Sequence, residues 1–173
     1  METKMPFYGI VNNFLPGLVL IGAYALMFFD DVRFLVEAIT DLGSTGLEIL
    51  VTVSLFALAY EIGYIIFRLG AALIEPILMK SFGWAEYADF IAASKTSEKA
   101  GSRLKMLSRE YGYARTRIML FVILALLTII ANDWWLLGIC LFCVLLFSIS
   151  ARSYMKKTQT AVKQYLSGNG GQQ

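Results

Sequence analysis

Four apolar stretches alternate with polar segments along the chain, and each is a candidate membrane-spanning helix. An α-helix needs about 20 residues to cross the hydrocarbon core of a bilayer. The first two stretches reach that length, the first of them only when its two asparagines and its proline are included. The last two reach it when residues 111–117 and 150–154 prolong them as helix. The stretches cover residues 7–29, 47–67, 118–131 and 134–149.

A two-residue polar break, Asn132-Asp133, separates the last two stretches. A break this short predicts a tight helical hairpin. Trp134 and Trp135 follow it directly, and tryptophan favours the membrane–water interface. We therefore expect the hairpin tip to lie at the far headgroup layer. A hairpin that enters the bilayer without crossing it is the alternative.

The composition favours burial in lipid. Of the 173 residues, 58% are hydrophobic and 16% are charged, whereas soluble domains have about half and about a quarter. A domain of this size leaves much of its surface exposed, so one small core would not hide the excess. The predicted fold class is an all-α integral membrane protein with four transmembrane helices and helical cytoplasmic extensions.

The lysines and arginines are distributed unevenly. Of the 15, all but Arg33 and Arg68 lie before the first stretch, between the second and third, or after the fourth. The first loop is instead acidic, through Asp30, Asp31, Glu37 and Asp41. Because cytoplasmic loops carry an excess of Lys and Arg, we expect both termini and the central segment to be cytoplasmic.

These patterns divide the chain into four parts. In the central segment a break at residues 94–97 separates two helical pieces, and Ser97 followed by Glu98 is typical of a helix start. Apolar residues then recur every three or four positions from Leu104 into the third span, which predicts one long helix. We expect the tail to prolong the fourth span. The parts are two transmembrane helices with an acidic external loop (1–80), a basic helical cytoplasmic insert (81–117), the transmembrane hairpin (118–151) and a basic cytoplasmic tail (152–173).

Polar residues recur every seven positions along the second span and beyond it. Seven residues are nearly two helical turns, so these residues share one side of a helix. Glu61 lies about 10 Å deeper than Arg68. An ionised carboxylate in lipid costs on the order of 2.5 kcal/mol or more, so it is expected to face protein or water. The residues predicted to line a pore or a subunit seam are Ser54, Glu61, Arg68 and Glu75.

Three interpretations of this stripe stay open: a structural seam, a water-lined path, and proton or ion coupling by Glu61 itself. Small residues in the same segment allow another helix, of the same chain or of another subunit, to approach closely. They are Ala57, Ala59, Gly63 and Gly70. We expect the helix to continue to Glu75 and to break near Pro76, because proline disfavours a helical conformation at the residue before it.

The insert and the tail hold many more cations than acidic residues. One interpretation is orientation in the membrane with contact to anionic lipid. Another is a site for a nucleotide or an oligonucleotide, with interleaved tyrosines stacking on bases. A third is the binding of a cytoplasmic protein partner. The residues predicted to form this face are Arg103, Lys105, Arg109, Arg115, Arg117, Lys156 and Lys157.

Residue types that commonly carry catalysis are scarce. The chain has no histidine, the commonest general base and metal ligand. Its two cysteines, Cys140 and Cys143, lie in an apolar run, where cysteine usually acts as a small packing residue. We find no glycine-rich phosphate-binding loop and no metal-spaced acidic cluster. The prediction is a protein that is not an enzyme and has no cofactor, metal or catalytic residue.

Three short segments carry a resemblance. They are Leu15-Pro16-Gly17, Ala59-Tyr60-Glu61-Ile62-Gly63-Tyr64 and Ser108-Arg109-Glu110-Tyr111-Gly112-Tyr113-Ala114-Arg115. The chain resembles small four-helix prokaryotic membrane proteins, some of them similar to the membrane components of anti-phage defence systems such as Hailong and Kiwa. The resemblance implies a homo-oligomer in the prokaryotic inner (plasma) membrane that senses infection or forms a pore. It implies no catalytic residues.

The preferred functional hypothesis combines these observations. It is a homo-oligomeric inner-membrane effector or channel-like protein, controlled through its basic cytoplasmic face by a protein partner or a nucleotide ligand. One alternative is a small proton-coupled transporter in which Glu61 titrates. The other is a non-conducting membrane anchor or sensor for a cytoplasmic partner.

Overall fold

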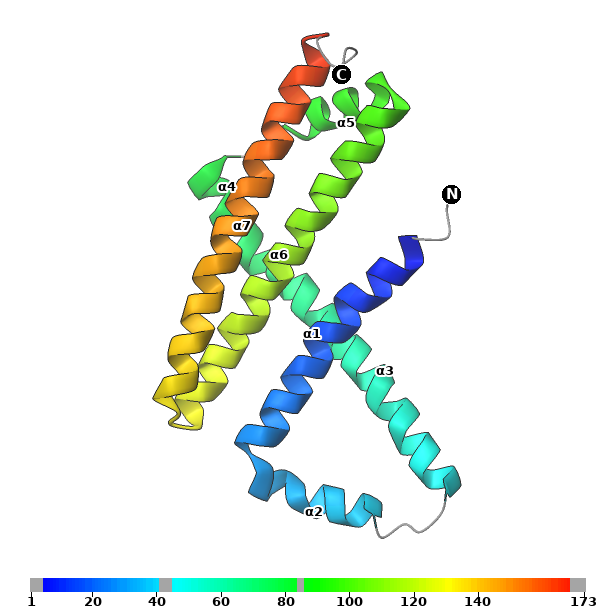
Figure 1. Cartoon of the computed structure of the whole chain (residues 1–173), viewed down its shortest axis with the longest axis vertical. Coiled ribbons are helices and arrows are strands. Elements are labelled where there is room, and N and C mark those ends of the chain that lie inside the picture. Colours follow the sequence, from blue (N-terminus) through cyan, green and yellow to red (C-terminus); the bar gives the residue numbers. More distant parts are fainter. Residues whose placement is uncertain (1–4, 41–44, 84–85, 169–173) are drawn as a thin grey trace. The chain divides into compact units, whose positions relative to one another are not determined.

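The computed structural model describes residues 5–40, 45–83 and 86–168, and every regular element in these ranges is helical (Figure 1). Asp41, named above, lies outside them. The elements are α1 (Met5–Met27), α2 (Phe29–Thr40), α3 (Thr45–Leu69), the π-helical turn η1 (Gly70–Ile74), α4 (Glu75–Phe82), α5 (Tyr87–Thr96), α6 (Glu98–Ile130) and α7 (Trp134–Leu166).

Four of the described helical segments are long and apolar enough to cross a membrane, which confirms the prediction of an all-α membrane protein with four transmembrane helices. The two arms of the hairpin have 33 residues each, or about 50 Å of helix. The hydrocarbon core is about 30 Å thick. Each arm is therefore long enough to span it and to continue well beyond it. The segments are Ile10–Met27, Gly46–Phe82, Glu98–Ile130 and Trp134–Leu166.

Side-chain caps fix the helix starts that the sequence predicts. The Ala100 backbone N–H donates to Ser97 Oγ at 3.1 Å, at the start of α6. At the hairpin tip the Leu136 backbone N–H donates to Asp133 Oδ1 at 3.2 Å, at the start of α7. Asn132 takes a positive φ of 57°, a conformation that asparagine tolerates better than most residues. The polar break thus both ends one helix and caps the next.

One local prediction is corrected by the structure. The second span does not break at Pro76: α4 continues to Phe82, with the proline in its first turn, where the missing N–H costs little. The irregularity falls one turn earlier, in η1. The acidic first loop contains the helix α2. There Arg33 Nε donates to Glu37 Oε1 at 2.7 Å.

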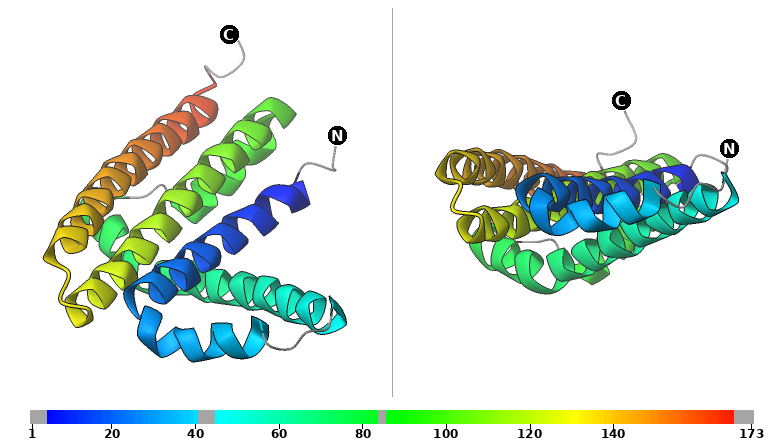
Figure 2. Two further views of the ribbon diagram at one scale, coloured as in Figure 1. Left: turned by 60° about the horizontal axis from the view of Figure 1, so that its bottom comes forward. Right: turned by 90° about the horizontal axis from the view of Figure 1, so that it is seen from below.

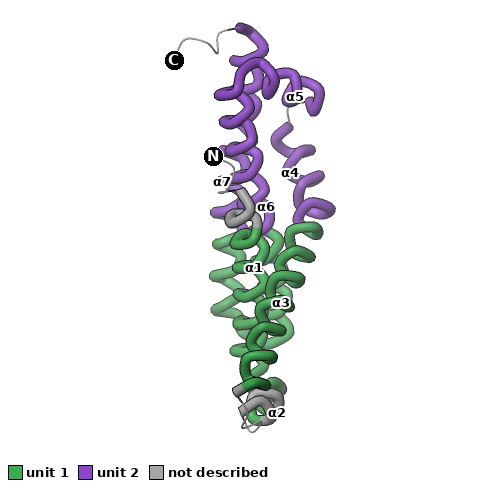
Figure 3. The backbone as a smooth tube through the Cα atoms, turned by 90° about the vertical axis from the view of Figure 1, so that its right-hand side faces the viewer, with its two compact units in different colours: residues 1–69, 119–143 green, residues 70–118, 144–173 purple. Residues whose placement is uncertain are grey.

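The chain divides into two compact units (Figure 3). Unit 1 comprises residues 1–69 and 119–143, and unit 2 comprises residues 70–118 and 144–173. Within each unit the segments of α6 and α7 lie side by side as arms of the hairpin (Figure 2). In unit 2 these arms enclose a core with α5, formed by Ala93, Ala100, Leu104, Leu107, Ala161, Val162 and Tyr165.

Candidate functional site

In unit 1, α1 crosses α3 with the two backbones in contact. Neither helix has a side chain at the crossing point, because Gly17 meets Gly63 there. A Cβ atom on Gly17 would overlap the Ala59 carbonyl oxygen, and one on Gly63 would overlap the Asn13 carbonyl oxygen. Ala59 is completely buried. The small residues of α3 therefore do admit another helix, and that helix belongs to the same chain.

Glu61 lies on the opposite side of α3 from this crossing. Successive residues of an α-helix are about 100° apart, so Ala59 and Gly63 are each turned about 160° from Glu61. Ser54 and Arg68, seven positions to either side, fall within about 20° of it. All three polar residues are exposed. The stripe predicted from the sequence thus forms an outward face of α3 from Ser54 to Arg68.

Apolar side chains border this stripe. Leu50, Leu58 and Ile65 are 63%, 50% and 54% exposed. These residues suit hydrocarbon or another apolar helix. Glu61 is therefore an acidic residue in a narrow polar stripe that apolar side chains border on a membrane-spanning helix.

The Arg68 guanidinium interacts with Tyr64, one turn earlier in the same helix. Arg68 Nε donates to the Tyr64 hydroxyl oxygen at 2.8 Å, and a second guanidinium nitrogen donates to the same oxygen. The guanidinium carbon lies 5.0 Å from the centroid of the Tyr64 ring, within the range of a cation–π interaction. Within the described ranges, Glu61 forms no ion pair and no hydrogen bond through its side chain.

The fourth residue of the predicted stripe belongs to a different site. Glu75 follows the wider turn of η1, which shifts the helical register because a π turn takes more residues than an α turn. In unit 2 the Arg115 guanidinium donates to the Glu75 carboxylate. The two side chains are only 8% and 25% exposed, for Arg115 and Glu75 in that order. Arg115 is therefore a buried partner of α4, and the structure removes it from the open basic face.

The other predicted cations lie at the surface of unit 2 to different degrees. Arg117 is half-buried, and its guanidinium carbon lies 4.7 Å from the Tyr113 ring centroid. Lys157 is exposed, with its Nζ 5.4 Å from the Tyr154 ring centroid. The remaining exposed cations are Arg103, Lys105, Arg109 and Lys156. We call these four residues together with Lys157 the basic surface.

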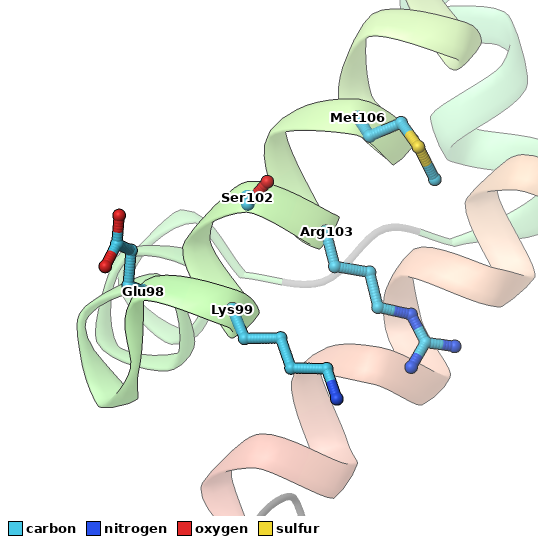
Figure 4. A pocket seen from close by; sticks show the side chains of 5 residues that line it. All are labelled: Glu98, Lys99, Ser102, Arg103 and Met106. Atoms are coloured by element: carbon cyan, nitrogen blue, oxygen red, sulfur yellow. The ribbon is translucent and has the colours of Figure 1, made fainter. Parts of the chain in front are cut away.

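A shallow pocket of about 490 Å³ adjoins the basic surface on α6. Lys99 and Arg103 are one helical turn apart and extend to the same side, whereas Glu98 points away from them (Figure 4). Two cations on one side of a helix attract anions. Ser102 and Met106 complete the lining.

Sequence reasoning missed several of these contributors. Tyr64 and Tyr113 each precede the arginine they hold by four residues, a spacing at which helix side chains meet. That spacing was a usable signal. Lys99 likewise precedes Arg103 by four residues. No comparable local signal connects Glu75 with Arg115, because the pair is 40 positions apart in the sequence.

Comparisons with known proteins do not identify a function for these residues. No protein-family model, no curated protein and no solved structure matches the chain. Within the described residues, no group of three or more Cys, Asp or Glu side chains is placed to hold a metal ion.

Proposed function

We propose that the protein is a homo-oligomeric, channel-like effector of the prokaryotic inner membrane, in which the outward face of α3 from several copies surrounds a polar path. The observation that carries this proposal is the position of Glu61. It lies deep in a membrane-spanning helix, opposite the crossing with α1, and is exposed in the single chain.

The energetic argument is one of desolvation. Leaving an ionised carboxylate in hydrocarbon costs on the order of 2.5 kcal/mol or more. Helix α1 covers the other side of α3, so the chain's own crossing helix does not shield Glu61. A second copy offers this face a polar surface to pack against, because each copy carries the same exposed stripe from Ser54 to Arg68. Water enclosed between the copies would then solvate the carboxylates.

The basic surface of unit 2 is proposed to bind the molecule that opens or closes this path. Both termini are proposed to be cytoplasmic, which places the basic surface where a nucleotide, an oligonucleotide or a protein partner reaches it. Exposed cations on a packed helical unit support such a role, because they attract anionic groups from a distance. The resemblance to membrane components of anti-phage defence supports an effector that opens when infection is sensed.

The proposal predicts the effect of removing the carboxylate. Purified protein in detergent is expected to have a protein mass that is a multiple of 19.3 kDa, and in liposomes it is expected to pass ions. Glu61→Leu is expected to lower the flux at least about tenfold, because it removes the polar group that keeps water in the path. The measurements are mass photometry or light scattering and a flux assay with an ion-sensitive dye.

A matched control lies on the same helix. Glu48 is exposed in the first turn of α3, and it is turned about 140° away from Glu61. Glu48→Leu removes the same charge from another side of α3, so it should leave flux and mass unchanged. A wild-type protein that stays at 19.3 kDa and passes no ions would refute the channel proposal.

A non-conducting anchor for a cytoplasmic partner is the second candidate. The core of unit 2, which packs α5 against both arms of the hairpin, favours it because a packed unit with exposed cations suits binding without transport. A partner that co-purifies with the wild type, but not with a Lys156→Glu/Lys157→Glu variant, would support this candidate if flux is absent.

A further inference from the structure

The side chains along α3 also determine which ions the proposed path would pass. We propose that the Glu61 carboxylates, one from each copy, form a binding site for small inorganic cations and make the path cation-selective. This inference rests on the proposed function. It is argued from three side chains of one helix face: Ser54, Glu61 and Arg68.

Glu61 is the deepest charge on this face. It lies about 10 Å further into the span than Arg68, at 1.5 Å per residue. A charge in a region of low dielectric constant acts more strongly on a nearby ion than one beside water. Salt screens the charges near the aqueous end, with a Debye length of about 8 Å at physiological ionic strength. The carboxylates therefore outweigh the guanidinium groups at the level of Glu61 in the proposed path.

The structure also keeps Arg68 from cancelling Glu61. The Tyr64 hydroxyl accepts hydrogen bonds from the Arg68 guanidinium, and the Tyr64 ring lies beside it. Tyr64 is turned about 60° from Glu61 around the helix axis, so the guanidinium is drawn to one side of the stripe. The tyrosine thus acts as a positioning residue for the positive charge.

Ser54 adds an oxygen further along the face. Its hydroxyl donates to the Leu50 carbonyl oxygen at 2.8 Å. With its proton used within the helix, the hydroxyl oxygen presents lone pairs to the outside. Oxygen atoms are the ligands that alkali and alkaline-earth cations prefer, whereas an anion needs a donor. The outward face between Ser54 and Glu61 therefore offers acceptors to a permeating cation.

The test measures the reversal potential of the full-length protein in a planar bilayer under a KCl gradient. The wild type is expected to favour K⁺ over Cl⁻ by at least about fivefold, as acidic rings do in cation channels. Glu61→Gln should bring the permeability ratio of the current that it still passes close to one. Glu61→Asp should restore the cation preference, and Glu61→Lys should reverse it. Arg68→Gln, as the control, should leave the sign of selectivity unchanged.

The outcomes separate the two proposals. A wild type that conducts without cation preference, or a Glu61→Gln variant with unchanged selectivity, overturns the cation site and leaves the channel standing. Absence of current from assembled wild-type protein overturns both. If Glu61→Gln does not assemble, the wild-type ratio and the Asp and Lys variants still decide the matter, because each predicts a definite direction of selectivity.

Discussion

A single methyl group added at Gly63 is expected to separate α1 from α3. The Cβ of Gly63→Ala would overlap the Asn13 carbonyl oxygen, which belongs to the backbone and has no rotamer with which to move aside. Overpacking in a tight site costs about 1–3 kcal/mol and occasionally more, and contact with a backbone atom puts this site at the upper end. A loss of about 3 kcal/mol corresponds to a drop of about 6–12 °C in Tm for a chain of this size. Thermal unfolding in detergent measures it.

The matched control is the same substitution at Gly22. That glycine lies in α1, and a Cβ there would meet no atom of another helix within 4 Å. Because alanine favours a helix over glycine by about 1 kcal/mol, Gly22→Ala should leave Tm unchanged or raise it. The two variants differ only in position and are expected to have effects of opposite sign. A similar loss in both would show that the crossing does not hold the helices as described.

Much of the fold followed from short-range pattern. The apolar stretches predicted the spans, and the Asn132-Asp133 break predicted the hairpin tip, where the structure adds that Asp133 caps α7. The Ser97-Glu98 pair predicted the start of α6. These features depend on neighbouring residues and on the length of helix that a bilayer requires, so the sequence contains nearly all the necessary information. The orientation across the membrane stays a prediction.

The sequence predicted the polar stripe of α3 correctly only where the helix is a regular α-helix with 3.6 residues per turn. From Ser54 to Arg68 the spacing of seven places the polar residues on one side of α3, as expected. The π turn of η1 then changes the helical register of the residues that follow. The residue types in Gly70–Ile74 do not predict a π turn. The small residues Ala59 and Gly63 indicated a close helix contact, but the pattern did not identify α1 as the partner.

The basic surface was predicted less accurately, because charge alone does not determine burial. Arg115 and Arg117 look equivalent in the sequence, yet one is buried against Glu75 and the other is half-buried beside Tyr113. The distinction depends on where α4 packs against α6 within unit 2. That arrangement rests on contacts between residues far apart in the sequence, which periodicity does not reveal.

Removing the carboxylate of the Glu75–Arg115 pair is expected to destabilise unit 2 strongly. Glu75→Leu leaves the Arg115 guanidinium buried without that carboxylate, and breaking a buried pair costs about 3–5 kcal/mol. Because Glu75 is 25% exposed, water offsets part of the loss, and we expect about 3 kcal/mol. Tm should fall by about 6–12 °C. The exposed pair of Arg33 and Glu37 is the control: its side chains are 64% and 58% exposed, so Arg33→Gln should cost about 1 kcal/mol or less.

The double variant Glu75→Leu/Arg115→Leu decides whether the loss reflects the buried charge of Arg115 or the lost contact between the two side chains. A hydrophobic pair in place of a buried ion pair is often neutral or stabilising, because neither side chain then requires desolvation. The double variant should therefore be more stable than Glu75→Leu alone. If the two losses simply add, the side chains do not interact in the folded protein. If the double variant instead recovers stability, the loss in Glu75→Leu comes from the buried charge of Arg115 and not from the lost contact.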